Sequence, residues 1–235
     1  MTSSQRFIDY SSHFNTTGFK AAFSLKQDSE INEKDRIFLA TTLHLDSAKL
    51  VIPKQTHSNH VKFCKKGGLP KDTDGLVSEK ESCVLSIQVA DCMPIYFVHK
   101  KDSVFGLVHV GWRGLVSGII NQCSKLLVEQ KYNLAHFQIL IGPSIQSCCF
   151  EVSEDVIDQF DPKFYEEKGS GKYRVHLQKL AMTHCLESGF IENEITVLSD
   201  CTFCEQEKYH SYRRNGKKSG KNDRTFRNEI VLFET

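Results

Sequence analysis

His57, Cys92 and His109 are the residues of this 235-residue sequence with the clearest capacity for chemistry. A thiolate and two imidazoles are competent ligands for Zn²⁺ or copper, and three protein donors leave the fourth position of a catalytic site open for water. Their intervals match no local metal motif. A buried structural cysteine, and histidines that merely close hydrogen bonds within the fold, are therefore alternatives. His60 is an alternative ligand to His57 if their loop turns differently.

The segments around these residues predict that each lies at the end of a β-strand. Short apolar runs predict strands at 50–52 and 84–98, and the second is interrupted at Ala90-Asp91-Cys92 and at Pro94. Residues 104–110 predict a strand that ends in Gly111-Trp112-Arg113-Gly114, and helical periodicity follows over 115–127. Loops at strand ends are favoured places for catalytic groups.

The remaining patterns predict a single α+β domain that covers residues 1–235. They indicate helices at 30–43, 154–160 and 177–185, and strands at 137–141 and 194–198. Strict alternation of strand and helix is absent, which favours mixed β-sheets covered by helices over a doubly wound sheet. The length suits one generous domain better than two.

Charge and cysteine content narrow the class of protein. Thirty Lys and Arg against 29 Asp and Glu give no long-range field for nucleic acid or a membrane surface, and the basic run at 213–221 is equally well a solvated loop. Nine cysteines without regular spacing predict reduced thiols, and no apolar segment resembles a signal or a span, so we expect a cytoplasmic protein. The pairs Cys201/Cys204 and Cys148/Cys149 are expected to be buried thiols without function.

Several short motifs occur in order over roughly four-fifths of the chain. They are Gln55-Thr56-His57, Asp74-Gly75-Leu76-Val77, Ala90-Asp91-Cys92-Met93-Pro94, His109-Val110-Gly111-Trp112-Arg113-Gly114, Ile141-Gly142-Pro143-Ser144-Ile145 with Phe150-Glu151-Val152, and His210-Ser211-Tyr212-Arg213-Arg214. Together they resemble the signatures of the YfiH family, also called laccase-domain or polyphenol-oxidase-like proteins. Residues 1–49 diverge from the family's text, and its terminal Thr-Gly-Arg is only loosely matched by Ser219-Gly220-Lys221.

The resemblance implies an α/β/β/α fold and an enzyme that acts on purine nucleosides. Members are described as phosphorolysing adenosine, inosine and methylthioadenosine, and as deaminating adenosine. It also implies that His57, Cys92 and His109 bind a metal, usually zinc, with copper as the alternative. The expected partners are a small nucleoside and phosphate, with no nucleic acid or membrane, and the expected state is a monomer or small homo-oligomer.

Four further residues are candidates for the same site. Asp91, beside Cys92, is a candidate proton carrier or orienter of the ligands, although acidic residues in bends are as often turn formers. Arg113 is a candidate phosphate holder, because a guanidinium beside a helix start favours anions; its alternative is a pair with a carboxylate. Ser211 and Arg213 are candidates for closing the pocket from the C-terminal side, and a plain surface loop explains them nearly as well.

Two other activities compete with the nucleoside enzyme. A metal-free hydrolase would use Cys92 as the nucleophile, with His109 lowering the pKa of its thiol. A copper phenol oxidase usually needs several coppers, whereas the sequence indicates one cluster of ligands, so this activity ranks third. A metal carrier without turnover is the non-enzymatic alternative.

Overall fold

The structure is a computed structural model that describes residues 7–16, 18–26, 33–79, 82–215 and 229–234. Its strands are β1 (Phe7–Asp9), β2 (Lys20–Ser24), β3 (Leu50–Val51), β4 (Val61–Cys64), β5 (Gly75–Glu79), β6 (Val84–Val89), β7 (Met93–His99), β8 (Val104–Val110), β9 (Phe137–Ile141), β10 (Glu151–Ser153), β11 (Tyr165–Gly169), β12 (Lys172–Val175), β13 (Ile195–Val197) and β14 (Glu229–Glu234). Its α-helices are α1 (Glu33–Thr42), α2 (Trp112–Val116), α3 (Ile119–Glu129), α4 (Glu154–Ile157), α5 (Leu177–Ser188) and α6 (Tyr212–Asn215).

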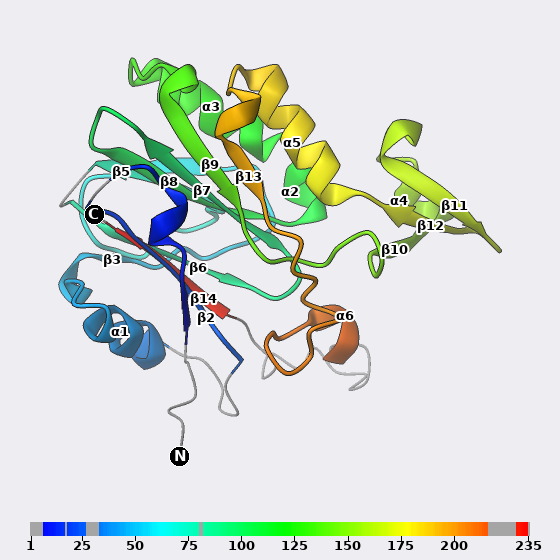
Figure 1. The fold of residues 1–235 in the computed structure, drawn as a ribbon, viewed down its shortest axis with the longest axis horizontal. Coiled ribbons are helices and arrows are strands. Elements are labelled where there is room, and N and C mark those ends of the chain that lie inside the picture. Colours follow the sequence, from blue (N-terminus) through cyan, green and yellow to red (C-terminus); the bar gives the residue numbers. More distant parts are fainter. Residues whose placement is uncertain (1–6, 17, 27–32, 80–81, 216–228, 235) are drawn as a thin grey trace.

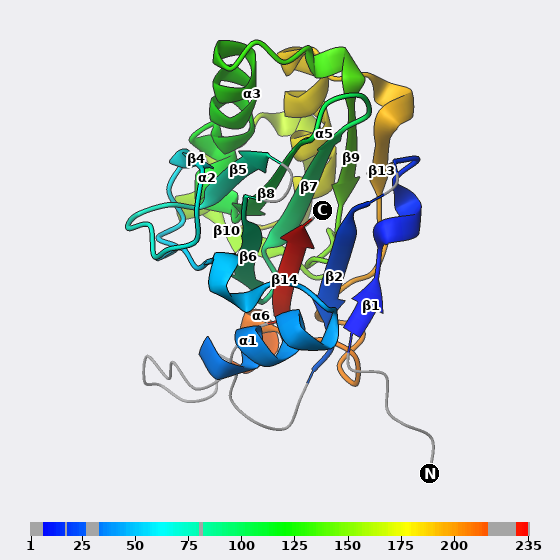
Figure 2. The same cartoon turned by 90° about the vertical axis from the view of Figure 1, so that its left-hand side faces the viewer.

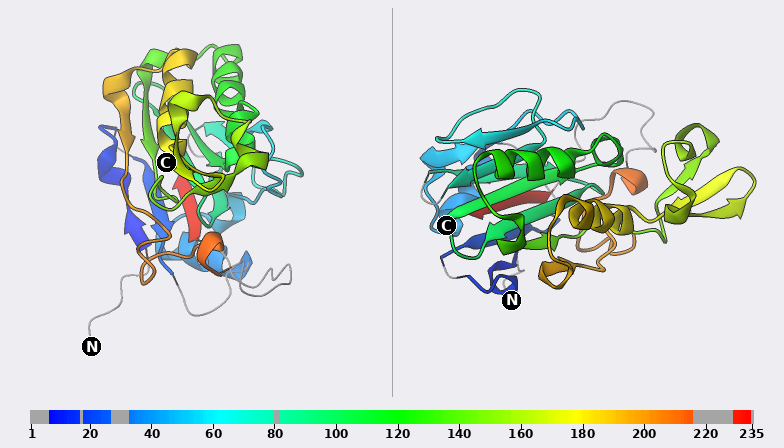
Figure 3. Two further views of the ribbon diagram at one scale, coloured as in Figure 1. Left: turned by 90° about the vertical axis from the view of Figure 1, so that its right-hand side faces the viewer. Right: turned by 90° about the horizontal axis from the view of Figure 1, so that it is seen from above.

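Two mixed sheets stacked face to face form the centre of the molecule (Figures 1 and 2). One has six strands in the order β13-β9-β7-β8-β5-β4, and the other has five in the order β1-β2-β14-β6-β3. Helices α2, α3 and α5 cover the outer face of the six-stranded sheet, as the view from above shows (Figure 3), and α1 covers the five-stranded sheet. The α/β/β/α arrangement and the α+β class are therefore confirmed.

The central strands are apolar throughout because both of their faces are buried. Along β7, Ile95 and Phe97 point toward the helices, whereas Tyr96 and Val98 point toward the second sheet. Successive side chains of a strand point to opposite faces, so a strand packed on both sides reads as a continuous apolar run. This is the physical reason that residues 84–98 contain so few polar side chains.

The strands and helices that the sequence indicated lie where they were predicted, with differences at three places. The helix predicted at 154–160 ends at Ile157, and residues 30–32 of the helix predicted at 30–43 lie outside the described residues. Pro94 does not interrupt the sheet: it is the second residue of β7, before the pairing with β9 begins at Ile95. A proline near the start of a strand costs no hydrogen bond to that neighbour. The helix predicted over 115–127 is two helices, α2 and α3, because Gly118 adopts a left-handed conformation with φ of 82° between them.

Some elements were not predicted from the sequence. A three-stranded sheet, β10-β12-β11, projects from one end of the molecule (Figure 1), and β14 lies between β2 and β6. Residues 216–221 of the basic run, which include Ser219-Gly220-Lys221, lie outside the described residues. Within the described residues, no helix has the length and apolarity required to cross a membrane.

Candidate metal centre

The side chains of His57, Cys92 and His109 meet where β8 ends and β7 begins. His109 is near the end of β8, Cys92 immediately precedes β7, and His57 lies in the loop between β3 and β4. Strands β7 and β8 are antiparallel neighbours in which Pro94 faces His109, so the sheet itself brings Cys92 close to that histidine. Residues separated by 35 and 17 positions in sequence therefore become neighbours through strand pairing.

The three ligand atoms form a compact group. Cys92 Sγ lies 3.7 Å from His57 Nε2, the two imidazole centroids are 4.8 Å apart, and the ligand atoms all lie within 4.8 Å of one another. A tetrahedral zinc with Zn–S of about 2.3 Å and Zn–N of about 2.05 Å requires a sulfur to nitrogen separation of about 3.6 Å. The donor set therefore fits a single zinc ion. His57 is exposed and His109 is buried, so the group opens toward solvent on one side.

Asp74 holds both histidines although the sequence analysis gave it no role. Its Oδ1 lies 2.8 Å from His109 Nδ1 and accepts the backbone N–H of His57 at 3.1 Å, and Oδ2 accepts the backbone N–H and the hydroxyl of Ser58 at 2.8 and 2.7 Å. The carboxylate is fully buried. A carboxylate on the far nitrogen fixes the tautomer of a metal-binding histidine and leaves the other nitrogen free for the ion.

The pKa of Asp74 reflects these contacts. Burial alone would raise it, but the hydrogen bonds from His109 and Ser58 and the charge on His109 outweigh burial and bring the pKa well below the ordinary value of 3.8. Asp74 is thus an anion at neutral pH. Its position in the Asp74-Gly75-Leu76-Val77 motif was the only sequence signal that could have indicated this role.

Without a metal, Cys92 and His109 share charge as a thiolate and an imidazolium. Burial raises the pKa of a thiol, yet the positive His109 and the hydrogen bonds from His109 and His57 lower that of Cys92 to about 6. The same contacts, with Asp74, raise the pKa of His109 to about 9 against the opposing effect of burial. A deprotonated thiol is the form that binds a metal or attacks an electrophile.

This charge sharing predicts the pH at which Cys92 becomes reactive in metal-stripped protein. Because its pKa is lowered, the thiolate persists down to about pH 6, and alkylation by iodoacetamide should rise through that value rather than near 9. Peptide mapping by mass spectrometry measures each cysteine separately. Cys148 is an internal control, since burial and neighbouring thiols raise its pKa to about 11. An inflection for Cys92 near that of an ordinary thiol would contradict the assignment.

Gly111 gives the ligands the space that they occupy. A Cβ atom at this position would lie 2.7 Å from Cδ2 of His57 and 3.1 Å from Sγ of Cys92. The Gly111→Ala variant should therefore push the two side chains apart and lower metal affinity about 10–100-fold, the range seen when the support of a metal ligand is disturbed. Elemental analysis after dialysis against a weak chelator measures this. Ser117→Ala, at the exposed residue that follows α2, should retain wild-type occupancy.

Asp91, Ser211 and Arg213 come together beside Cys92. Asp91 occupies the bend between β6 and β7 with φ of 80°. One of its carboxylate oxygens accepts the hydroxyl of Thr202 at 2.7 Å, and the other accepts the hydroxyl of Ser211 at 3.0 Å and the backbone N–H of Arg213 at 2.7 Å. Asp91 therefore fastens the segment that carries Ser211 and Arg213 to the bend that carries Cys92.

The guanidinium groups of the three arginines near the site differ in their hydrogen-bond partners. The guanidinium of Arg213 donates to the carbonyl of Glu151 at 2.7 Å, and that of Arg214 donates to the carbonyls of Thr202, Phe203 and Tyr209. Arg113 is exposed, its guanidinium lies 4.5 Å above the ring of Trp112, and no ion pair joins it to a carboxylate among the described residues. The alternative of an Arg113–carboxylate pair is therefore not found in the described part of the chain.

His60 does not join the ligands. Its Nδ1 lies 3.0 Å from a carboxylate oxygen of Asp72 on the exposed side of the loop. His57 has a positive φ of 61°, and this turn of the backbone, held by Asp74, separates the directions of the two side chains. The preference for His57 over His60 at the centre agrees with this geometry.

Comparison with known proteins adds to this geometry. The family model described as "Multi-copper polyphenol oxidoreductase laccase" matches residues 3–225. This chain belongs to that laccase family. The resemblance to the YfiH family is likewise confirmed, since the solved structure of Bacillus licheniformis hypothetical protein YfiH superposes on the chain with a TM-score of 0.82 and 26% identity over 92% of each chain.

Two relatives of this laccase-family chain have names that state an activity. "Purine nucleoside phosphorylase YlmD" of Geobacillus stearothermophilus is 31% identical over 156 residues, which are 63% of this chain and 57% of that protein, less than two thirds of its length. "Adenosine deaminase RL5" of an unknown prokaryotic organism is 28% identical over 203 residues, which are 79% of this chain and 78% of that protein.

The laccase-family chain holds a second group of cysteines that the sequence did not predict to lie together. Cys148 and Cys149, just before β10, and Cys201 and Cys204, after β13, come together although about 50 residues separate the pairs. Cys148 and Cys204 are exposed and Cys149 is half-buried, so the expectation of buried thiols is correct only for Cys201. Spacing in sequence could not have revealed the group, because a crossover in the fold, through the β10-β12-β11 sheet and α5, brings the two pairs together.

Proposed function

We propose that this chain is a metal-dependent enzyme of purine nucleosides. It phosphorolyses adenosine, inosine or methylthioadenosine to the free base and ribose 1-phosphate or its methylthio analogue, and it also deaminates adenosine. The observation that carries the proposal is the convergence of His57, Cys92 and His109 on one point, with Asp74 holding both histidines. The activities stated in the names of the two relatives support a nucleoside as the substrate.

The proposed metal is zinc, bound by Cys92 and the two histidines, with copper as the alternative. When bound through three protein ligands, zinc supplies Lewis-acid activation of water at neutral pH, the chemistry that deamination of a purine requires. The protein contributes the rest. Asp74 keeps the proton on Nδ1 of His109, and the buried side of the centre excludes competing water.

Phosphorolysis needs an anion held for attack on the anomeric carbon of the ribose. Arg113 is our candidate for this task. It lies two residues after Gly111, where an added Cβ would clash with His57 and Cys92, and its guanidinium has no carboxylate partner among the described residues. A planar guanidinium binds phosphate through two parallel hydrogen bonds. Arg213 and Ser211 are proposed to form the wall opposite, through their bonds to Asp91. A proton-carrying role for Asp91 stays a prediction.

A hydrolase that uses Cys92 as its nucleophile is the second candidate. The observation that favours it is the lowered pKa of the Cys92 thiol next to a His109 of raised pKa. Such a pair can attack an amide or ester without a metal. This candidate predicts that removal of metal leaves activity intact, whereas the nucleoside enzyme should lose activity when stripped and regain it with zinc.

The deciding experiment compares two histidines of one loop. Adenosine and inosine are incubated with phosphate, and free base, ribose 1-phosphate and inosine are measured by chromatography. We expect turnover by the wild type and a loss of at least about 100-fold in His57→Ala, because one of three metal ligands is removed. His60→Ala should retain activity, since His60 contacts Asp72 instead. Equal turnover by His57→Ala and the wild type would rule the proposal out.

A further inference from the structure

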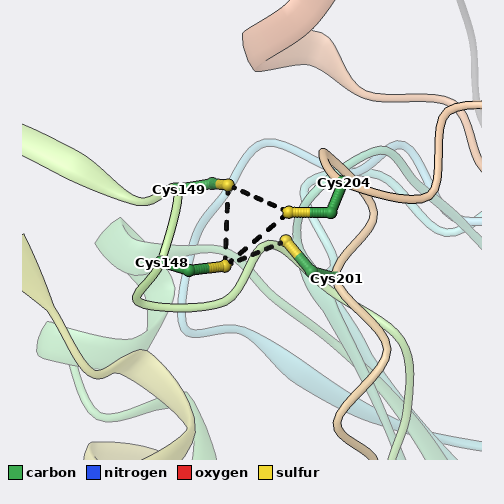
Figure 4. Close-up of side chains that lie close together, drawn as sticks. All are labelled: Cys148, Cys149, Cys201 and Cys204. Atoms are coloured by element: carbon green, nitrogen blue, oxygen red, sulfur yellow. Dashed lines mark hydrogen bonds between the residues drawn. The ribbon is translucent and has the colours of Figure 1, made fainter.

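The four sulfur atoms of Cys148, Cys149, Cys201 and Cys204 converge on one point (Figure 4). The Sγ of Cys148 lies 3.6 Å from that of Cys149, 3.6 Å from that of Cys201 and 3.8 Å from that of Cys204, and the Cys149 and Cys204 sulfurs are 3.3 Å apart. All four ligand atoms lie within 4.8 Å of one another. Two separate loops thus contribute two thiols each.

These separations match the edges of a small tetrahedron. A zinc ion bound by four thiolates at about 2.3 Å requires sulfurs about 3.8 Å apart. A disulfide would bring two sulfurs to about 2.05 Å, and a cluster of two or four irons would require a wider frame because its four thiolates are divided among several irons. All four cysteines are free thiols in the structure.

Two groups near Cys201 would stabilise negative charge at the cluster. The backbone N–H of Gln146 donates to the sulfur of Cys201 at 3.5 Å. The guanidinium of Arg214 donates to the carbonyls of Thr202 and Phe203 at 3.0 and 2.7 Å, which places a positive charge against the turn between Cys201 and Cys204. Thiolates bound to zinc retain part of their charge, so backbone N–H groups and a nearby cation stabilise such a site.

We propose that Cys148, Cys149, Cys201 and Cys204 bind one Zn²⁺ ion in a closed structural site, separate from the centre at His57, Cys92 and His109. Four thiols lose their protons to solvent as the four Zn–S bonds form, and nothing is oxidised or reduced. Four protein ligands leave no open position, so this ion holds the structure together and does not react with substrate.

The position of the site indicates which segments of the chain a bound zinc ion would connect. Cys201 follows the segment that runs beside the loop after β9, where the N–H of Thr202 donates to the carbonyl of Ser144 at 3.2 Å. Thr202 also bonds to the carboxylate of Asp91, and the N–H of Ile145 donates to the carbonyl of Asp91 at 3.0 Å. Both loops that the ion would join therefore contact the bend next to Cys92. A zinc ion bound to the two loops would therefore stabilise the conformation of that bend.

The test counts zinc in the whole protein. Reduced protein is loaded with zinc, desalted, and analysed for metal by mass spectrometry. We expect two equivalents in the wild type, one in the Cys148→Ser/Cys204→Ser variant, and one in His57→Ala. Cys64→Ser is the matched control: Cys64 lies outside both groups, and its thiol donates to the carbonyl of Lys62, a bond that a serine hydroxyl can also make. It should retain two equivalents.

Two outcomes would overturn the site. One is an equal zinc content in the wild type and the Cys148→Ser/Cys204→Ser variant. The other is a thiol titration of native, zinc-free protein that finds these cysteines paired as disulfides. If the double variant does not fold, cobalt substitution of the wild type and of Cys148→Ser decides instead. The wild type should show the intense near-ultraviolet absorption of cobalt with four thiolates, and this absorption should be weaker in Cys148→Ser. An undiminished intensity in Cys148→Ser would reject the site. The number of zinc equivalents is measured without nucleoside turnover, so failure of the four-cysteine site can be distinguished from failure of the proposed function.

Discussion

Cys92→Ala should abolish phosphorolysis and deamination together, with the metal of the His57 centre lost at the same time. Cys92 supplies the only sulfur among the three ligands and is drawn toward its ionised form by His109 and His57. Apparent binding energies of four-ligand zinc sites are about 10–16 kcal/mol, so the loss of one ligand costs on the order of 3 kcal/mol, or about 100-fold in affinity. Loss of the water-activating ion should lower turnover further.

The measurement combines nucleoside turnover with elemental analysis of the same samples. Cys64→Ser is again the control, because it removes a buried thiol outside both groups of ligands. The Cys–His hydrolase also predicts inactivity for Cys92→Ala, so metal-stripped wild type is included. Stripped protein that turns over at the rate of the loaded enzyme would exclude the metal-dependent mechanism. Full turnover by Cys92→Ala would exclude both mechanisms.

Asp74→Asn should weaken the metal centre although Asp74 does not touch the metal. The carboxylate receives His109 Nδ1, the backbone N–H of His57 and two donors from Ser58. An asparagine has one oxygen and an NH₂ group, so at least one of these donors would face another donor. Loss of such a partner typically costs about 10–100-fold in metal affinity or activity, and an unpaired buried group costs about 1–3 kcal/mol of stability.

Metal affinity and the free energy of unfolding are both measured for this variant. Because the folded pKa of Asp74 is lowered, its stabilising contribution is fully present above the unfolded value of about 3.8 and is lost as the pH falls further. The stability gap between wild type and Asp74→Asn should therefore narrow below about pH 4. Asp72→Asn changes an exposed carboxylate of the same loop and should leave affinity within about twofold. If the difference in the free energy of unfolding between the two proteins stays constant below about pH 4, the role of the Asp74 charge is contradicted.

The sequence predicted strands most accurately where both faces of a strand are buried. The runs at 104–110 and 137–141 coincide with β8 and β9, because continuous apolar stretches bounded by polar turns have few other structures. Strand pairing over long distances is not encoded in local patterns. The placement of β14 between β2 and β6, and the hairpin β11–β12, therefore escaped prediction.

The candidate site was found through motifs rather than through spacing. The family resemblance linked His57, Cys92 and His109, and their ligand atoms lie within 4.8 Å of one another. Asp74 was noted only as part of a motif and was given no role. A buried acceptor that serves backbone N–H groups has no sequence signature of its own. The four-cysteine group was missed for a related reason: its two pairs meet only after α5 and β13 have returned the chain to the loop after β9.

The place of β14 also bears on the order in which the chain can fold during synthesis. Residues 229–234 separate β2 from β6 in the five-stranded sheet, so until they leave the ribosome the β1–β2 hairpin and the β6–β3 pair each present an unpaired edge. Such edges are templates for wrong pairing between nascent chains. Because the bend that carries Cys92 continues directly from β6, we expect the ligands to reach their final positions only after this last strand is inserted.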